Sequence, residues 1–223
     1  VGETCPLYLL HPPGGVVGGD TLDISVRLDA KSHTLITMPG ASKFYRSSGP
    51  QARLHQHFYL DEGSTLEWLP QDTIIFPGAN AALRSVFHLK ASSTLLAWEL
   101  YCLGRPVIGE TFSHGTLESR LEVWVDDEPR LIERQHLGDG DLTPVAGHPW
   151  IGTLLFYPAN EEHLDAVRAL LAPLGHFAGA TLTDELLSVR FLSHDNLICQ
   201  RVMRDIWQSL RPLLTTKTAF SPR

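Results

Sequence analysis

The sequence has no apolar run near the roughly 18 to 20 residues that a membrane-spanning helix needs. Its first 20 residues hold no basic segment followed by an apolar core, so we expect neither a membrane span nor a signal peptide. The three cysteines Cys5, Cys102 and Cys199 are far apart and odd in number, which favours reduced thiols and a cytoplasmic location. The chain begins at Val1 rather than at methionine, and we expect both of its ends to be trimmed.

Positive charge is also scarce. The 223 residues include 18 Lys or Arg against 25 Asp or Glu, a net charge of −7 with neutral histidines, which excludes a general nucleic-acid binder. The motifs Gly-x4-Gly-Lys, Gly-x-Ser-x-Gly, His-Glu-x-x-His and Cys-x-x-Cys are absent. We therefore expect that this chain does not hydrolyse GTP by itself. With 43% hydrophobic and 19% charged residues, the composition is that of a folded globular protein.

What is present first is a repeated unit of strand, polar turn and strand between residues 21 and 135. The copies begin 32 and then 29 residues apart, and they are Val26–Leu35, Phe58–Leu66, Phe87–Leu95 and, more loosely, Val123–Leu131. A unit of this length buries its apolar face by stacking on its neighbours. The pattern predicts a β-solenoid or two packed layers of hairpins, and a meander with similar turns is the alternative.

A turn over residues 138–141 divides the chain into two regions. Residues 1–137 form the β-repeat region, and residues 138–223 read as a β-α-β-β-α region packed on it within one structural domain. The first helix is expected from the N-cap Asn160 to Pro173, and the second from Asn196 until Pro212. The fold class is therefore mainly β, with stacked strand repeats and two α-helices in the C-terminal third.

A histidine pair gives the most enzyme-like pattern. His55 and His57 alternate onto one face of a strand, and Glu62 follows, a spacing that could bind a metal ion. The pattern resembles the first half of the cupin metal motif, but the nearest match to the second half, ending at His148, departs from it. A cupin-like metalloenzyme and simple surface histidines are both open readings.

Single carboxylates also interrupt apolar runs. Glu67, Glu99 and Glu133 do so within expected strands, and Asp20 follows a glycine-rich stretch. A buried carboxylate is costly unless it is paired or hydrated. Each could lie on a half-exposed strand or in a salt bridge, but together they indicate a water-filled interior whose oxygen ligands pass a divalent cation without holding it tightly.

Four longer stretches carry a family resemblance. They are HPPGGVVGGD at 11–20, MPGASKFYR at 38–46, LEWLPQDTIIF at 66–76 and ELYCLGRPVIGE at 99–110. Through them the chain resembles, over essentially its whole length, the urease accessory protein family UreD, also called UreH. The resemblance implies a β-helix-like fold with two helices and no catalytic turnover of its own.

The resemblance also implies a role. Members of the family are chaperones for nickel insertion into urease, which bind the urease apoenzyme and the accessory protein UreF, and through UreF the GTPase UreG. We expect nickel(II) only in transit, with no tightly bound cofactor, no nucleic acid and no membrane. The expected passage is lined by Asp20, Glu99 and Glu133, with Glu67 and Glu110 as further candidates. On the basic last helix we expect Arg201 and Arg204 to bind a partner. A scaffold that never touches nickel is the alternative within this reading.

Overall fold

The computed structural model describes residues 4–11 and 13–219, with the backbone alone over residues 215–219. Val1 and residues 222–223, where we expect the trimmed ends, lie outside the described residues. The described strands form two sheets. Sheet A runs in the order β1 (Cys5–Tyr8), β3 (His33–Thr37), β6 (Thr65–Leu69), β9 (Thr94–Arg105), β13 (Trp150–Tyr157), β15 (Leu186–Ser193) and β14 (Ala178–Thr183). Sheet B runs in the order β12 (Glu128–Gly138), β11 (Thr116–Val125), β8 (Asn80–Leu89), β5 (Ala52–Leu60) and β2 (Thr21–Leu28).

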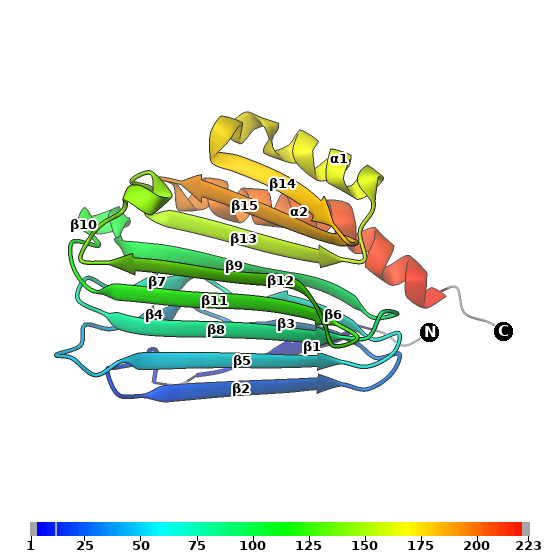
Figure 1. The fold of residues 1–223 in the computed structure, drawn as a ribbon, viewed down its shortest axis with the longest axis horizontal. Helices are drawn as coiled ribbons and strands as arrows, with labels where there is room; N and C mark the ends of the chain where they lie inside the picture. The colour runs from blue at the N-terminus through cyan, green and yellow to red at the C-terminus, as the bar shows by residue number, and fades with distance from the viewer. Residues whose placement is uncertain (1–3, 12, 220–223) are drawn as a thin grey trace.

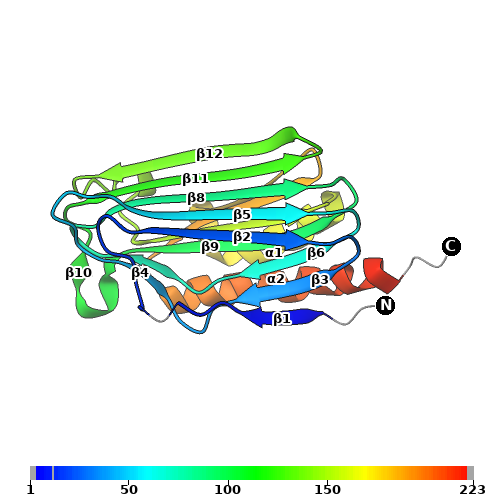
Figure 2. The same cartoon turned by 90° about the horizontal axis from the view of Figure 1, so that it is seen from below.

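Three short strands complete sheet A: β4 (Ser42–Phe44) pairs with β7 (Thr73–Ile75), and both β7 and β10 (Glu110–Thr111) pair with β9. The two sheets face each other, and the helices α1 (Glu161–Leu171) and α2 (Asn196–Ala219) cover the outer side of sheet A (Figures 1 and 2). Sheet A continues from β9 into β13, so it spans residue 138 without a break.

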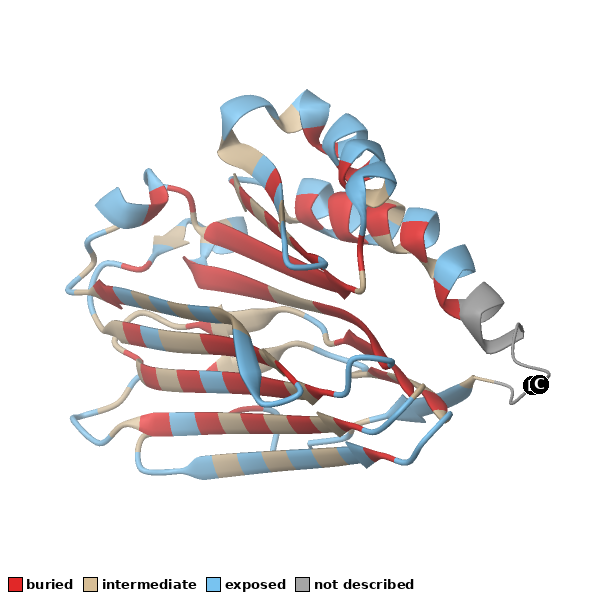
Figure 3. Cartoon of the chain, turned by 45° about the vertical axis from the view of Figure 1, so that its right-hand side comes forward, coloured by how far each residue is buried: buried red, intermediate tan, exposed pale blue. Residues whose placement is uncertain are grey.

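The structure confirms the stacked β arrangement that the repeated unit of the sequence predicts. Each of the first three copies runs along sheet B, turns, and returns along sheet A, so that these copies pair in parallel in both sheets. Phe58 lies opposite Val26 on one side and Phe87 on the other, and the rings of Phe58 and Phe87 stack with centroids 4.6 Å apart. The apolar residues of the copies fill the space between the sheets, and Figure 3 shows the resulting stripes of buried and exposed positions.

The turns explain why a serine recurs in each copy. The hydroxyls of Ser32, Ser64 and Ser93 each donate a 2.7 Å hydrogen bond to the carbonyl three residues earlier. The turns also bond to one another along the stack, because the Thr65 N–H donates to the Ser32 carbonyl and the Thr94 N–H to the Ser64 carbonyl. The same four-residue turn is thus built three times at one end of the molecule.

The structure corrects two details of the repeat. Because the three turns have equal length, Thr34 rather than Leu35 lies opposite Leu66, and Leu35 packs on the helix side of sheet A. The fourth copy, Val123–Leu131, does not return along sheet A, since β11 and β12 form an antiparallel hairpin within sheet B. Asp126 and Asp127 both have positive φ, as a two-residue hairpin turn requires, and so the chain reverses there instead of crossing between the sheets.

The first helix agrees with the sequence prediction. Its N-cap Asn160 accepts a hydrogen bond from the His163 N–H, and the His163 side chain accepts one from the Asn160 N–H. Leu164, Val167 and Leu171 form its buried stripe. The second helix begins at Asn196 as expected, but the prediction that it ends before Pro212 is wrong, because α2 continues to Ala219. Leu210 and Leu214 are buried on either side of the proline, and this packing offsets the backbone hydrogen bond that proline cannot make.

The turn serines give a first prediction. Ser64 is fully buried, and Ser64→Ala removes its hydrogen bond to the Asp61 carbonyl, so we expect the free energy of unfolding to fall by about 1 kcal/mol. Urea denaturation followed by circular dichroism measures this. The control Ser209→Ala, at an exposed position of α2, should change stability by less than about 0.5 kcal/mol. Equal stability of both variants would mean that the turn bond contributes nothing.

Candidate functional site

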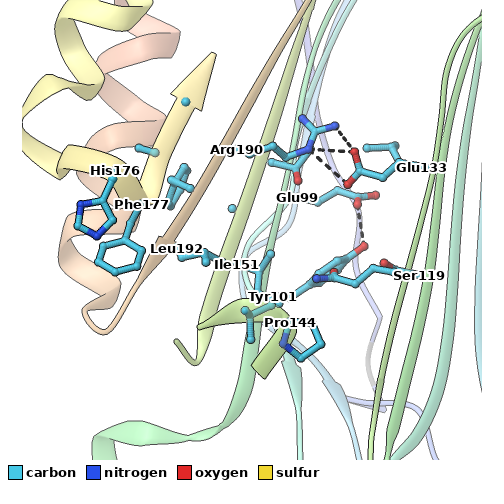
Figure 4. Close-up of a pocket in the computed structure, with 18 residues that line it drawn as sticks. Glu99, Tyr101, Ser119, Glu133, Pro144, Ile151, His176, Phe177, Arg190 and Leu192 are labelled. Atoms are coloured by element: carbon cyan, nitrogen blue, oxygen red, sulfur yellow. Dashed lines mark hydrogen bonds and ion pairs between the residues drawn. The ribbon is translucent and has the colours of Figure 1, made fainter. Parts of the chain in front are cut away.

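A cavity of about 420 Å³ opens between the two sheets at the point where sheet B ends and sheet A continues. Its walls come from β11 and β12 of sheet B on one side and from β9, β13, β14 and β15 of sheet A on the other. Sheet B ends at β12, which reaches β15 through the contact of Glu133 with Arg190, whereas sheet A continues beyond β15 to β14. The charged residues of the cavity are Glu99, Glu133 and Arg190 (Figure 4).

Glu99 points into the interior from the middle of β9. Strand alternation places it there, because Ala97 and Leu95, two and four residues earlier on the same strand, also face the core between the sheets. Its carboxyl accepts a 2.6 Å hydrogen bond from the Tyr101 hydroxyl and lies 2.5 Å from the Ser85 hydroxyl of sheet B. The group therefore ties the two sheets together across the interior.

The protonation of Glu99 follows from its surroundings. Burial raises the pKa of this carboxyl above its ordinary value, although the hydrogen bonds from Ser85 and Tyr101 oppose the shift. Ser85 Oγ also lies 2.8 Å from Gln56 Oε1, and a hydroxyl has one proton to donate. When Glu99 is ionised, the Ser85 hydroxyl donates to its carboxylate; when Glu99 is protonated, the carboxyl donates to Ser85, which can then donate to Gln56. Burial likewise raises the pKa of the Tyr101 hydroxyl far above its usual range.

Glu133 faces Glu99 across the cavity and is held differently. It lies on the inward face of β12, and the guanidinium of Arg190 on β15 contacts both of its oxygens, with Nη2 2.5 Å from Oε2 and Nε 3.3 Å from Oε1 (Figure 4). Such a two-pronged pair fixes both side chains. Thr153 is the register neighbour of both Glu99 and Arg190, so these three residues form one row across the inner face of sheet A.

A second, much smaller cavity of about 20 Å³ lies on the other side of Glu99 and Tyr101. Both residues line both cavities, and the small one is bordered by Gln56, Trp68 and Thr73. Its volume suits about one water molecule. The hydrogen-bonded pair of Glu99 and Tyr101 is thus the wall that separates two spaces in the interior.

The structure brings together two of the five carboxylates that the sequence suggests for a passage, Glu99 and Glu133. Asp20 is exposed in the loop before β2, where its side chain lies 3.5 Å from the Val17 N–H. Glu110 pairs with Arg105 at the surface, beside the exposed tip formed by Val107 and Ile108. Neither of them lines the cavities described here.

Glu67 is buried on the opposite side of sheet A, beneath α2. It accepts a 2.9 Å hydrogen bond from His33 Nε2 and a 2.6 Å hydrogen bond from Trp207 Nε1, and Arg211 Nε lies 3.4 Å away as an ion pair. Burial alone would raise its pKa, but the hydrogen bonds from His33 and Trp207 and the charge of Arg211 outweigh this, so its pKa is lowered. Glu67 is an ionised anchor for helix α2.

The histidine pair lies on the outside of the molecule. His55 and His57 project from the outer face of β5, where His55 Nδ1 lies 3.0 Å from Asp23 Oδ1, and Glu62 is in an exposed turn. His148 is elsewhere, with its ring 4.2 Å from that of His194. No group of three or more His, Cys, Asp or Glu side chains within residues 4–11 and 13–214 is placed to hold a metal ion.

On α2, Arg201 and Arg204 are both exposed. Arg204 borders a groove of about 330 Å³ between α2 and the outer face of sheet A, together with Trp98, Met203 and Trp207. None of the helices in the described part of the chain is long and apolar enough to cross a bilayer.

Sequence reasoning missed Ser85, Tyr101 and Arg190. Of these, Arg190 could have been found from the sequence. It is a single cation within the apolar run of β15, just as the candidate carboxylates are single charges within apolar runs. Its partner Glu133 is 57 residues away, so the pairing depends on the sheet order.

The molecule is thus a β-solenoid whose cavity between the sheets is lined by carboxylates and whose sheet A is covered by helices on its outer face. Comparison with known proteins identifies its family. The family described as UreD urease accessory protein matches residues 1–223. The urease accessory protein UreD of Enterobacter sp. (strain 638) is 76% identical over 221 residues, covering 99% of this chain and 81% of that protein. The corresponding protein of Klebsiella aerogenes is 69% identical over 221 residues, covering 99% of this chain and 82% of that protein. The corresponding protein of Pseudomonas putida (strain GB-1) is 52% identical over 222 residues, covering 100% of this chain and 80% of that protein. The chain belongs to the UreD family of urease accessory proteins.

The raised pKa of Glu99 predicts a pH dependence of stability. The folded state holds this proton more tightly than the unfolded chain, so wild-type stability falls as the pH rises above the ordinary value of 4.5 and through the raised pKa. Glu99→Gln keeps a neutral side chain and loses this dependence. Relative to wild type it should gain about 1.4 kcal/mol for each unit by which the folded-state pKa exceeds the unfolded one. Urea denaturation at a series of pH values tests this, with Glu62→Gln in an exposed turn as the control. A stability difference that does not vary with pH would contradict it.

The lowered pKa of Glu67 predicts a pH dependence of stability with the opposite sign. Folding favours the ionised form of Glu67. Its contribution to the free energy of unfolding is therefore present above pH 4.5 and is lost as the pH falls through the lowered pKa. At pH 7 we expect Glu67→Ala to lower the free energy of unfolding by about 3 kcal/mol, because it leaves His33, Trp207 and Arg211 without their acceptor. Trp207→Phe removes one donor and should cost only about 1 kcal/mol. Thermal denaturation at pH 7 and pH 3 measures both, and a cost for Glu67→Ala that persists undiminished at pH 3 would refute the ionised anchor.

Proposed function

We propose that this chain is a nickel-insertion chaperone of urease maturation. In this role it binds the urease apoenzyme, is linked through UreF to the GTPase UreG, and conducts nickel(II) through its interior towards the urease active site. The observation that carries the proposal is the cavity between the sheets where Glu99 and Glu133 face each other, in a chain that belongs to a family of urease accessory proteins.

The chemistry of the cavity suits a cation in transit. Carboxylate and hydroxyl oxygens bind a borderline divalent metal more weakly than imidazole or thiolate, and weak ligands release their cargo. In the proposed resting state, a protonated Glu99 donates to Ser85, which donates to Gln56, and Glu133 holds the Arg190 guanidinium. Nickel exchanges for both: Glu99 loses its proton to water and Arg190 separates from Glu133. The two ionised carboxylates then balance the two charges of the nickel ion, and the released Arg190 leaves one positive charge that favours onward movement of the ion.

The wall between the two cavities is the barrier that the ion crosses in this proposal. Glu99 is held from sheet B by Ser85 and from sheet A by Tyr101, and it lines the spaces on both sides. A nickel ion bound by Glu99 displaces these two hydroxyls, which removes the link that closes the wall. Rotation of this one side chain then hands the ion from the larger space to the smaller.

Partner binding is assigned to α2. Arg201 and Arg204 are exposed there and leave a basic surface on an otherwise acidic chain, next to the groove that contains Trp98 and Trp207. The competing function is a scaffold that joins urease to UreF without touching nickel. A cupin-like metalloenzyme built on His55, His57 and Glu62 gains no support, because the two histidines project outward from sheet B and Glu62 lies in a turn.

Urease activation in cells tests the passage. A urease operon lacking this gene is complemented with the wild-type chain, with Glu99→Gln/Glu133→Gln, or with Glu110→Gln as a matched control that neutralises a surface carboxylate. We expect the double variant to lower nickel per urease about tenfold while still co-purifying with urease, and the control to behave as wild type. Nickel is counted by atomic absorption. If the double variant assembles and restores nickel fully, the chain is a scaffold and its acidic interior is structural.

A further inference from the structure

The outer face of sheet B is uncovered. No helix of the described chain crosses it, and both helices pack on the side of sheet A (Figures 1 and 2). Its strands β2, β5, β8 and β11 pair in parallel. Parallel sheets are generally covered on both faces. Here only the inward positions of β2 and β5 are apolar, so a partner that covers this face meets polar side chains.

The residues that project from this face are not those of an ordinary solvated surface. Strand alternation places five arginines and four histidines there against three carboxylates, and no lysine. The arginines are Arg27, Arg53, Arg84, Arg120 and Arg134, and the carboxylates are Asp23, Glu118 and Glu122. Enrichment in arginine and aromatic residues with depletion of lysine is typical of the centre of protein–protein interfaces.

Three of these arginines form a row. Arg84, Arg120 and Arg134 lie directly opposite one another on β8, β11 and β12. Like charges in opposite positions of neighbouring strands destabilise a sheet. The row lines a hollow of about 420 Å³ on the outer face, so its charge is concentrated at one place.

One carboxylate holds part of this row in position. Glu122 is only 2% exposed although it projects from the outer face, and it accepts a hydrogen bond of 3.0 Å from Arg84 Nε and one of 3.1 Å from Trp124 Nε1. Arg120 Nε lies 2.7 Å from the same carboxylate. Arg134 is exposed and has no hydrogen bond or ion pair with any residue that the structure describes. Glu122 therefore holds two of the three arginines, whose fixed guanidinium groups lose little further entropy on binding, and leaves the charge of Arg134 unpaired.

A second row on the same face supplies rigid contact area. The Arg27 guanidinium lies 4.1 Å above the Tyr59 ring, and the rings of Tyr59 and His88 stack with centroids 5.0 Å apart. Trp124 is the register neighbour of His88. Flat side chains already held in place contribute binding energy at low entropic cost.

We propose that the outer face of sheet B is a docking surface for a carboxylate-rich surface of a folded partner protein, whose acidic side chains pair with Arg84, Arg120 and Arg134. The turn end of the face carries Asp29, Asp61, Asp126 and Asp127, so an extended polyanion such as a nucleic acid meets repulsion a short distance from the arginine row. A compact acidic patch avoids it. This inference does not depend on the passage of nickel.

Direct binding of an acidic probe tests the surface. A fluorescein-labelled peptide of four glutamates, about 13 Å long when extended and so close in size to the row across three strands, is titrated with the purified chain at low ionic strength, and its fluorescence anisotropy is followed. We expect Arg134→Glu to raise the Kd about tenfold, and added salt to weaken wild-type binding. Arg134→Gln repeats the test without a new charge. Lys43→Glu, which makes the same charge change on β4 of sheet A, is the matched control and should leave the Kd within about twofold of wild type.

Three outcomes would overturn the proposal. Equal weakening by Arg134→Glu and Lys43→Glu would show a response to net charge only, and no binding of the peptide by the wild-type chain would remove the acidic partner. Tighter binding of a labelled single-stranded oligonucleotide of four nucleotides would assign the arginine row to phosphates instead. All three can be recorded on a chain that still loads urease with nickel, so a failure here is distinct from a failure of the nickel passage.

Discussion

Parallel pairing between successive copies of the strand–turn–strand unit decides where the side chains of this molecule point. The pairing runs without offset through β2, β5 and β8 in one sheet and through β3, β6 and β9 in the other. Equivalent residues therefore lie in rows, and each row is wholly inside or wholly outside. The stacked phenylalanines of the core, the serines of the turns and the arginines of the outer face are all products of this one constraint.

The same constraint makes the environment of each carboxylate a matter of strand parity. Glu67 faces out of sheet A and meets donors from α2, so it is ionised, whereas Glu99 faces the interior, and burial raises its pKa. Glu122 faces out of sheet B and remains ionised because two arginines approach it, although burial opposes this. Carboxylates that look alike in the sequence thus acquire different chemistry from the face on which they lie.

The repeat, the two helices and the mainly β fold class could be predicted from the sequence, because apolar alternation and turn residues are local signals. The direction of the fourth unit could not, because it depends on the positive φ of Asp126 and Asp127, which the pattern of apolar residues does not reveal. The extent of α2 beyond Pro212 depends on the burial of Leu214, which is a tertiary contact. For the candidate site, an acid within an apolar run correctly indicated an unusual environment for Glu67, Glu99 and Glu133. Which of them share a cavity depends on the order of β9, β12 and β15 across the sheets, and this order is not local.

The reversal of the chain at Asp126 and Asp127 has a consequence for how such a molecule can change in size. It ends sheet B while sheet A continues, and the larger cavity lies at this mismatch. An additional unit inserted before β8 would lengthen the stack by one coil and leave in place all the strands that line this cavity, which are β9 and β11 to β15. The number of coils and the geometry of the larger cavity can therefore vary independently. Evolution can change the length of this protein without altering the cavity.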